Sequence, residues 1–149
     1  MKVAVLMGSA SDQARMSQAT ELLGTFGVEA TEHVLSAHRT PEAVATFARA
    51  ARDDGYGVLI CGAGMAAALP GVVAAFTTLP VIGVPLSGSA LAGIDALYAI
   101  VQMPRGVPVA TVAVDGAANA ALLAVEILAV TDGDLAAKLA TYREAWTAP

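Results

Sequence analysis

A histidine and an arginine lie side by side in residues 36–41, where the chain reads Ser-Ala-His-Arg-Thr-Pro. Histidine changes protonation near neutral pH, so His38 is suited to proton transfer. The fork of donors on Arg39 is suited to a phosphate or a carboxylate, and Ser36 adds a hydroxyl group. We therefore predict that His38 is a catalytic acid/base and that Ser36 and Arg39 bind an anionic ligand. His33 lacks such neighbours and is interpreted as structural.

A second polar segment lies near the N-terminus, at residues 8–12. Gly8 allows a ligand to approach the backbone, and Ser9 and Ser11 offer hydroxyl groups. The free N–H groups of the helix expected to follow favour an anion, and Asp12 could accept hydrogen bonds from a ribose diol. The alternative is that Ser11 or Asp12 only caps that helix. The segment lacks the Gly-Lys-Ser/Thr ending of a nucleoside-triphosphate loop.

The third segment, residues 62–71, is rich in glycine and alanine and has no charged side chain. Its backbone N–H groups could hold a carboxylate, and its small side chains leave room for a planar ring. The alternative is close packing of a helix on a sheet. The Gly-x-Gly pattern lacks a third glycine, so it is weak evidence for a dinucleotide site. The substrate-binding residues predicted in this segment are Ala63, Gly64, Met65, Ala66 and Leu69.

Metal and thiol chemistry have little support in the sequence. The single cysteine, Cys61, and the two histidines lack the spacing of a zinc site, so we predict no metal. Cys61 ends an apolar run and is interpreted as a buried residue rather than a nucleophile. A single cysteine also excludes an internal disulfide.

The three segments can form one site only if the elements before them end at the same place. Short apolar runs closed by glycine or proline predict strands, and apolar residues at helical spacing predict helices. Pro70 and Gly71 must start, kink or delay the third expected helix. The expected strands are residues 3–7, 29–35, 57–61, 80–84 and 107–112; the expected helices are residues 12–26, 41–52, 65–76, 93–102, 116–130 and 134–146.

Alternating strands and helices indicate a parallel sheet that is covered by helices on both faces. We predict an α/β fold with three αβα layers, a flavodoxin-like strand order of 2-1-3-4-5 and an additional C-terminal helix, as one domain over residues 1–149. In such sheets ligands bind beyond the carboxyl ends of the strands, where the strand order reverses. All three segments begin at such ends, so we expect them to surround one site.

The composition restricts the partners. The net charge is −5 and the few basic residues are scattered, which argues against nucleic-acid binding. The longest apolar stretch, residues 58–76, is interrupted by glycines and a proline, so we expect no membrane span. The first apolar run is too short for a signal peptide, so we expect a cytoplasmic protein.

Apolar residues make up 56% of the chain and charged residues only 14%, which is more apolar surface than a small domain usually hides. We therefore expect some helices to pack on other subunits. Leu135, Leu139, Tyr142 and Trp146 have helical spacing, and we predict that their helix packs on a neighbour. Asp95 and Glu126 are interpreted as surface or subunit-contact residues.

Taken together, the motifs resemble those of N5-carboxyaminoimidazole ribonucleotide mutases, over about residues 3 to 146. The matching runs are Val-Leu-Met-Gly-Ser with Ser11-Asp12, the Ser-Ala-His-Arg-Thr-Pro run, Gly-Ala-Gly at 62–64, Leu-Pro-Gly at 69–71, Pro-Val-Ile-Gly-Val-Pro at 80–85, Gln-Met-Pro at 102–104 and Asn-Ala-Ala-Leu-Leu-Ala at 119–124. The Ser-Ala-His-Arg-Thr-Pro run is the most specific of them.

The resemblance implies a flavodoxin-like homo-octamer that converts N5-carboxyaminoimidazole ribonucleotide into 4-carboxyaminoimidazole ribonucleotide without a metal or an organic cofactor. It implies that His38 handles the proton transfers. Ser9, Asp12, Ser36 and Arg39 match the contacts to phosphate and ribose. The small-residue segment, residues 63–69, matches the part that holds the carboxylate and the base.

One position departs from the mutase pattern. Mutases usually have a second histidine just before the Leu-Pro pair, and this chain has Ala68. The sister class, which carboxylates aminoimidazole ribonucleotide with free CO2, usually has lysine in place of Arg39. Arg39 therefore favours the mutase and Ala68 weakens that assignment.

Two other readings stay open. One is a non-catalytic module that binds a nucleotide monophosphate on the same fold. The other is a relative of the enzyme that carboxylates a pyridinium nucleotide for a nickel cofactor. The run at residues 36–41 and the Gln-Met-Pro run argue against the latter.

Overall fold

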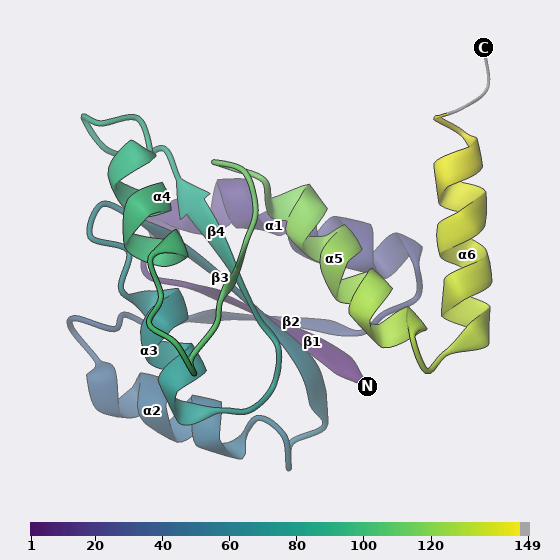
Figure 1. The fold of residues 1–149 in the computed structure, drawn as a ribbon, viewed down its shortest axis with the longest axis horizontal. Coiled ribbons are helices and arrows are strands. Elements are labelled where there is room, and N and C mark those ends of the chain that lie inside the picture. Colours follow the sequence, from purple (N-terminus) through teal and green to yellow (C-terminus); the bar gives the residue numbers. More distant parts are fainter. Residues whose placement is uncertain (147–149) are drawn as a thin grey trace.

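The computed structural model describes residues 1–146, in which a five-stranded parallel sheet lies between two layers of helices (Figure 1). The strand order is β2-β1-β3-β4-β5, as predicted. The strands are β1 (Lys2–Met7), β2 (Ala30–Val34), β3 (Tyr56–Gly64), β4 (Val81–Leu86) and β5 (Ala110–Thr111); the helices are α1 (Gln13–Thr25), α2 (Pro41–Ala50), α3 (Leu69–Phe76), α4 (Ile94–Val101), α5 (Ala117–Ala129) and α6 (Gly133–Glu144).

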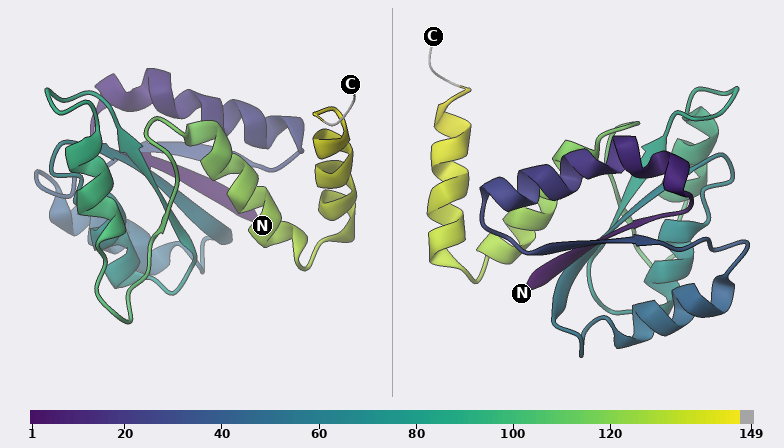
Figure 2. Two further views of the ribbon diagram at one scale, coloured as in Figure 1. Left: turned by 45° about the horizontal axis from the view of Figure 1, so that its top comes forward. Right: turned by 180° about the vertical axis from the view of Figure 1, so that it is seen from behind.

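The central strands are apolar because both of their faces are covered. Along β1, Val3 and Val5 belong to the core that includes residues of α1 and α5, whereas Ala4 and Leu6 belong to the core under α2, α3 and α4. Figure 2 shows α1 and α5 on one side of the sheet and α2 on the other. The edge strand β2 is only half-buried, which accounts for its polar sequence.

Three expected elements differ most from their bounds in the structure. Strand β3 extends to Gly64 because its last residues pair with β4, Gly62 with Val84 and Gly64 with Leu86. Helix α3 begins at Leu69 rather than at residue 65, since Pro70 is accommodated in the first turn. Strand β5 has two residues rather than six, in a segment where Pro108 has no N–H to donate.

Helix α6 stands at one end of the molecule and contacts it along one side (Figures 1 and 2). Leu135 is buried, and Leu139 and Tyr142 pack against the core shared by α1 and α5. The ring of Tyr142 lies 5.4 Å from that of Phe26. Three of the four residues that suggested a contact with a neighbour are thus used within the chain, and Trp146 stays exposed.

Candidate functional site

A cavity of about 430 Å³ lies beyond the carboxyl ends of β1, β2, β3 and β4, where the strand order reverses between β1 and β3. This volume suits a small ligand. Every predicted site residue lines the cavity: Gly8, Ser9, Ser11, Asp12, Ser36, His38, Arg39, Ala63, Gly64, Met65, Ala66 and Leu69. The structure therefore brings the three predicted segments together.

The first wall follows β1 and is a short 3-10 turn, Ala10–Asp12. Ser9 caps this turn, since its Oγ accepts from the N–H of Ser11 at 3.3 Å and from the hydroxyl of Ser11 at 2.9 Å. Asp12 precedes α1 but makes no capping hydrogen bond with its side chain. The alternative that the Asp12 side chain only caps the helix is therefore not supported, because Asp12 occupies the N-cap position without a capping bond from its carboxylate.

The electrostatics of Asp12 distinguish it from an ordinary surface acid. Partial burial raises the pKa of Asp12, while the backbone of Ser9 and the positive charge of Arg15 oppose that rise. A carboxylate at the cavity wall that lacks a strong partner can accept hydrogen bonds from ligand hydroxyl groups.

The second wall, residues 36–40, is a turn that closes on itself before α2. The hydroxyl of Thr40 donates to the Ser36 carbonyl at 3.0 Å and accepts from the Ser36 N–H at 3.1 Å. Arg39 joins this wall to the first, because its Nη2 donates to the Gly8 carbonyl at 3.4 Å and its Nε donates to Ser36 Oγ at 3.4 Å. The guanidinium is thereby held beside the cavity.

His38 lies at the tip of this turn and is exposed. Within residues 1–146 its ring makes no hydrogen bond, so both ring nitrogens are available to a ligand. An imidazole at the rim of a cavity, beside a fixed guanidinium, is arranged for proton transfer on an anionic molecule.

The third wall is the end of β3 and the loop 65–68. Met65 and Ala67 have φ values of 55° and 40°, which lie in the left-handed region that residues other than glycine rarely adopt. The Ala67 N–H donates to the Gly64 carbonyl at 3.0 Å, which closes the loop into a tight turn. The apolar side chain of Met65 remains exposed at the cavity.

Several lining residues were not predicted as site residues: Ala37, Ala67, Ala68, Leu86 and Gly88. The first three lie between predicted positions. Leu86 and Gly88 come from the end of β4, which the sequence pattern placed two residues too early. The rule that ligands bind at strand carboxyl ends could have found them, because β4 is adjacent to β3.

His33 and Cys61 lie outside the cavity lining, as interpreted from the sequence. His33 Nε2 lies 2.9 Å from Thr31 Oγ1, and its ring lies 4.6 Å from that of Phe47. Burial and the charge of Lys2 lower the pKa of His33. Cys61 is fully buried, and burial raises the pKa of its thiol, so it is a poor nucleophile.

Two further features are absent from residues 1–146. No group of three or more His, Cys, Asp or Glu side chains is placed to hold a metal ion. None of the helices described is both long and apolar enough to cross a membrane.

A doubly covered parallel sheet with a cavity at its reversal point defines a flavodoxin-like α/β protein with a candidate site for a small ligand. Residues 2–148 match the model of the family described as AIR carboxylase, and the chain belongs to that family.

Two relatives and one solved structure illustrate the similarity. The chain is 52% identical to an N5-carboxyaminoimidazole ribonucleotide mutase of Vibrio vulnificus, over 99% of this chain and 92% of that protein. It is 54% identical to a mutase of the same name from Pyrococcus abyssi, over 96% and 82%. The crystal structure of Treponema denticola PurE has a TM-score of 0.89 at 34% identity, covering 97% of this chain and 90% of that one.

Proposed function

We propose that this protein is an N5-carboxyaminoimidazole ribonucleotide mutase of purine biosynthesis. The observation that carries the proposal is the convergence of His38, Arg39 and Asp12 on one cavity whose remaining wall is made of small, uncharged residues. The identity of more than half of the chain to proteins of that name supports the same reaction.

The polar walls suit the ribose phosphate of the substrate. Arg39, with the hydroxyl groups of Ser9 and Ser36 beside it, would hold the phosphate, since a guanidinium matches phosphate geometry. Asp12 would accept hydrogen bonds from the ribose diol. The backbone and small side chains of residues 63–69 would hold the carboxylate and the imidazole ring.

The reaction balances with a single acid/base. Protonated His38 gives a proton to the carbamate nitrogen, the N–C bond breaks with its electron pair left on nitrogen, and CO2 is released into the cavity. The ring carbon then attacks the CO2, and neutral His38 removes the proton from that carbon. His38 ends protonated, so no proton is gained or lost overall.

Ala68 bears on how many groups take part. Ala68 lines the cavity, where mutases usually have a second histidine. Of the lining residues, only Asp12, His38 and Arg39 carry an ionisable side chain. We assign both proton transfers to His38. We propose that the third wall, the end of β3 and the loop 65–68, excludes water from the released CO2.

A paired assay on the purified protein tests the reaction. One sample receives N5-carboxyaminoimidazole ribonucleotide without bicarbonate, and the other receives aminoimidazole ribonucleotide with modest bicarbonate. Rapid formation of 4-carboxyaminoimidazole ribonucleotide in the first sample alone is expected. Rapid product in the second would assign the CO2-using carboxylase, the second candidate, since Ala68 departs from the mutase pattern. No product in either would point to a non-catalytic binding module.

The substitution His38→Asn tests the mechanism. It removes the acid/base but keeps a polar side chain of similar size. We expect turnover to fall by about two or more orders of magnitude, with binding of aminoimidazole ribonucleotide nearly unchanged. Stopped assays and titration calorimetry measure the two quantities. Full activity in His38→Asn would overturn the assignment of His38.

We also propose that the protein is a cytoplasmic homo-octamer. Leu91, Ile94, Tyr98 and Val101 form an exposed apolar stripe along α4 and the turn before it, which we call the α4 stripe. The spacing of Ile94, Tyr98 and Val101 places these three side chains on one face of the helix, and Leu91 lies in the turn before it. A buried free thiol is compatible with a reducing compartment.

A further inference from the structure

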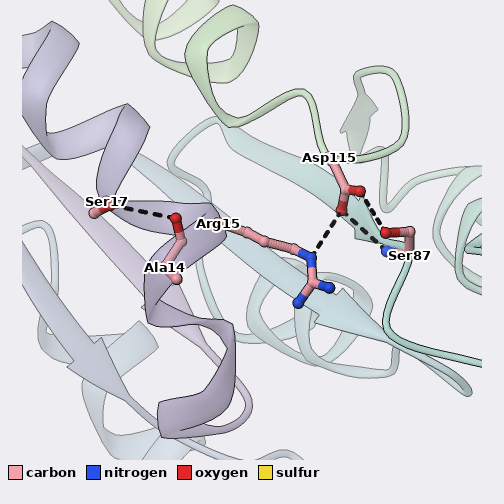
Figure 3. A network of polar contacts seen from close by, with 5 residues as sticks. All are labelled: Ala14, Arg15, Ser17, Ser87 and Asp115. Atoms are coloured by element: carbon pink, nitrogen blue, oxygen red, sulfur yellow. Dashed lines mark hydrogen bonds and ion pairs between the residues drawn. The ribbon is translucent and has the colours of Figure 1, made fainter.

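A cluster of polar side chains lies just outside the cavity, where α1, the loop after β4 and the loop before α5 meet (Figure 3). Asp115 is its centre. Its Oδ1 accepts from the Ser87 N–H at 3.0 Å, its Oδ2 accepts from the Ser87 hydroxyl at 2.5 Å, and the Arg15 Nε lies 3.6 Å from Oδ1. One carboxylate thus joins three segments that are far apart in sequence.

The backbone fixes where this carboxylate points. Asp115 has a φ of 56°, a left-handed conformation that aspartate tolerates better than most residues. Its N–H donates to the Pro85 carbonyl at 2.8 Å, so the loop is attached to the end of β4. The following N–H of Gly116 donates to the Ala113 carbonyl at 2.9 Å, which tightens the turn. The aspartate is therefore held on a rigid support.

Both partners of Asp115 are close in sequence to residues that line the cavity. Leu86 and Gly88, the neighbours of Ser87 in sequence, line the cavity, whereas Ser87 and Asp115 do not. Arg15 follows Asp12 by three residues, a spacing that places side chains at a helix start close together. The charge of Arg15 already acts on Asp12, since it opposes the rise in the pKa of that acid.

We propose that Asp115 is a positioning residue for substrate binding. It fixes the wall formed by Leu86 and Gly88 through Ser87, and it holds Arg15 away from Asp12 so that the Asp12 carboxylate stays free for the ribose diol. This role rests on the proposed function only in the identity of the ligand.

Loss of the Asp115 charge releases Arg15. The Arg15 side chain is 41% exposed and stays within one helical turn of Asp12 in sequence. The carboxylate of Asp12, three residues earlier, already feels the charge of Arg15, and an ion pair between them would compete with the ribose hydroxyl groups. The consequence is weaker binding with intact proton-transfer groups, because His38 lies on a different wall.

The test compares Asp115→Asn with Glu126→Gln. Asparagine keeps the left-handed backbone, and Glu126 forms the ion pair with Arg143 that joins α5 to α6, away from the cavity. We expect Asp115→Asn to raise KM and the Kd of aminoimidazole ribonucleotide roughly tenfold, with kcat within about twofold of the unmodified protein. Glu126→Gln is expected to change neither. Equal KM and Kd in the two variants would overturn the proposal.

The double variant Arg15→Met with Asp115→Asn separates positioning from a general loss of structure. Methionine keeps the length of the apolar stem and cannot pair with Asp12. The double variant is expected to regain much of the lost affinity, whereas Arg15→Met alone binds nearly normally. Affinity that is no better in the double variant than in Asp115→Asn would overturn the proposal that Asp115 holds Arg15 away from Asp12.

The same experiment distinguishes the two proposals. Turnover of the unmodified protein tests the mutase assignment, and calorimetric titration with aminoimidazole ribonucleotide tests the cavity independently of turnover. An unmodified protein that binds but does not turn over overturns the mutase and leaves the comparison of variants intact. An unmodified protein that does not bind overturns both proposals.

Discussion

Asp12 is the residue whose ionisation should control how the cavity recognises a ribose. Its carboxylate makes no capping bond in α1. Partial burial raises its pKa above the ordinary value of 3.8, with opposition from the Ser9 backbone and Arg15. An acid with a raised pKa becomes protonated at a higher pH than usual as the solution is acidified. Protonated Asp12 loses acceptor capacity, so binding should weaken earlier than for an ordinary aspartate.

The pH dependence of binding tests this role. We expect the affinity for aminoimidazole ribonucleotide to fall as the pH is lowered through the raised pKa of Asp12, and we expect Asp12→Asn to lack that part of the fall. Calorimetric titrations from about pH 7 down to about pH 3.5 would measure it. The substrate phosphate titrates equally in both proteins, so it cancels in the comparison. Parallel curves for the two proteins would contradict the role of Asp12.

Among single residues, those that line the cavity were predicted well from the sequence, but the residues that position the cavity walls were missed. His38, Arg39 and Asp12 could be found because polar side chains after apolar strands are unusual. Asp115 could not be found, since it is a lone acid in a small-residue loop and its partner Ser87 is 28 residues away. Local patterns predict which residues face a ligand better than they predict distant polar partners.

Among the elements, β4 shows how glycine allows helices to approach the sheet. A Cβ atom on Gly83 would lie 2.4 Å from Ile100 Cγ2, 3.0 Å from Val109 Cγ1 and 3.4 Å from Pro70 Cβ. These atoms come from α4, the segment before β5 and α3. The close contact keeps α3 and α4 against the strands whose ends form the cavity.

The substitution Gly83→Ala is therefore expected to reduce the free energy of unfolding by about 1–3 kcal/mol, because Ile100 must move and Val109 must give way slightly. Gly24→Ala, in the last turn of α1, is the matched control, since its Cβ would meet nothing within 4 Å. That control is expected to be neutral or to stabilise by up to about 1 kcal/mol. Urea unfolding at fixed protein concentration measures both. Equal stability of the two variants would show that the sheet and helices adjust freely.

The bounds and packing partners of elements were predicted less well than their order, as β3 and α6 show. The Gly-Ala-Gly end of β3 reads as a loop, and only its pairing with β4 makes it a strand. The apolar face of α6 was assigned to a neighbour, yet Leu135, Leu139 and Tyr142 pack on the same chain. Helical spacing shows that a face is buried but not which partner covers it. Packing of α6 on a neighbour stays a prediction.

For the whole molecule, the question is what covers its remaining apolar surface. The chain exposes 7586 Å², whereas a compact monomer of its 14.9 kDa mass exposes roughly 7000 Å². Part of the difference follows from the projection of α6 (Figure 1). The α4 stripe adds four side chains that are between 48% and 64% exposed, three of them on one face of α4. Such a contiguous apolar surface is typical of a subunit interface.

The substitution Ile94→Glu tests whether the α4 stripe joins subunits. Ile94 lies at the start of α4 between Leu91 and Tyr98, so a glutamate there would place an unpaired charge within the interface and dissociate the octamer. Val130→Glu is the control, because Val130 is 83% exposed but lies at the end of α5 outside the stripe. Sedimentation velocity measures the assembly, and circular dichroism verifies that each variant is folded.

Dissociation confined to Ile94→Glu would support the interface, because charge added to an exposed apolar side chain elsewhere would then have no such effect. A monomeric unmodified protein, or an intact octamer in Ile94→Glu, would mean that the stripe does not join subunits.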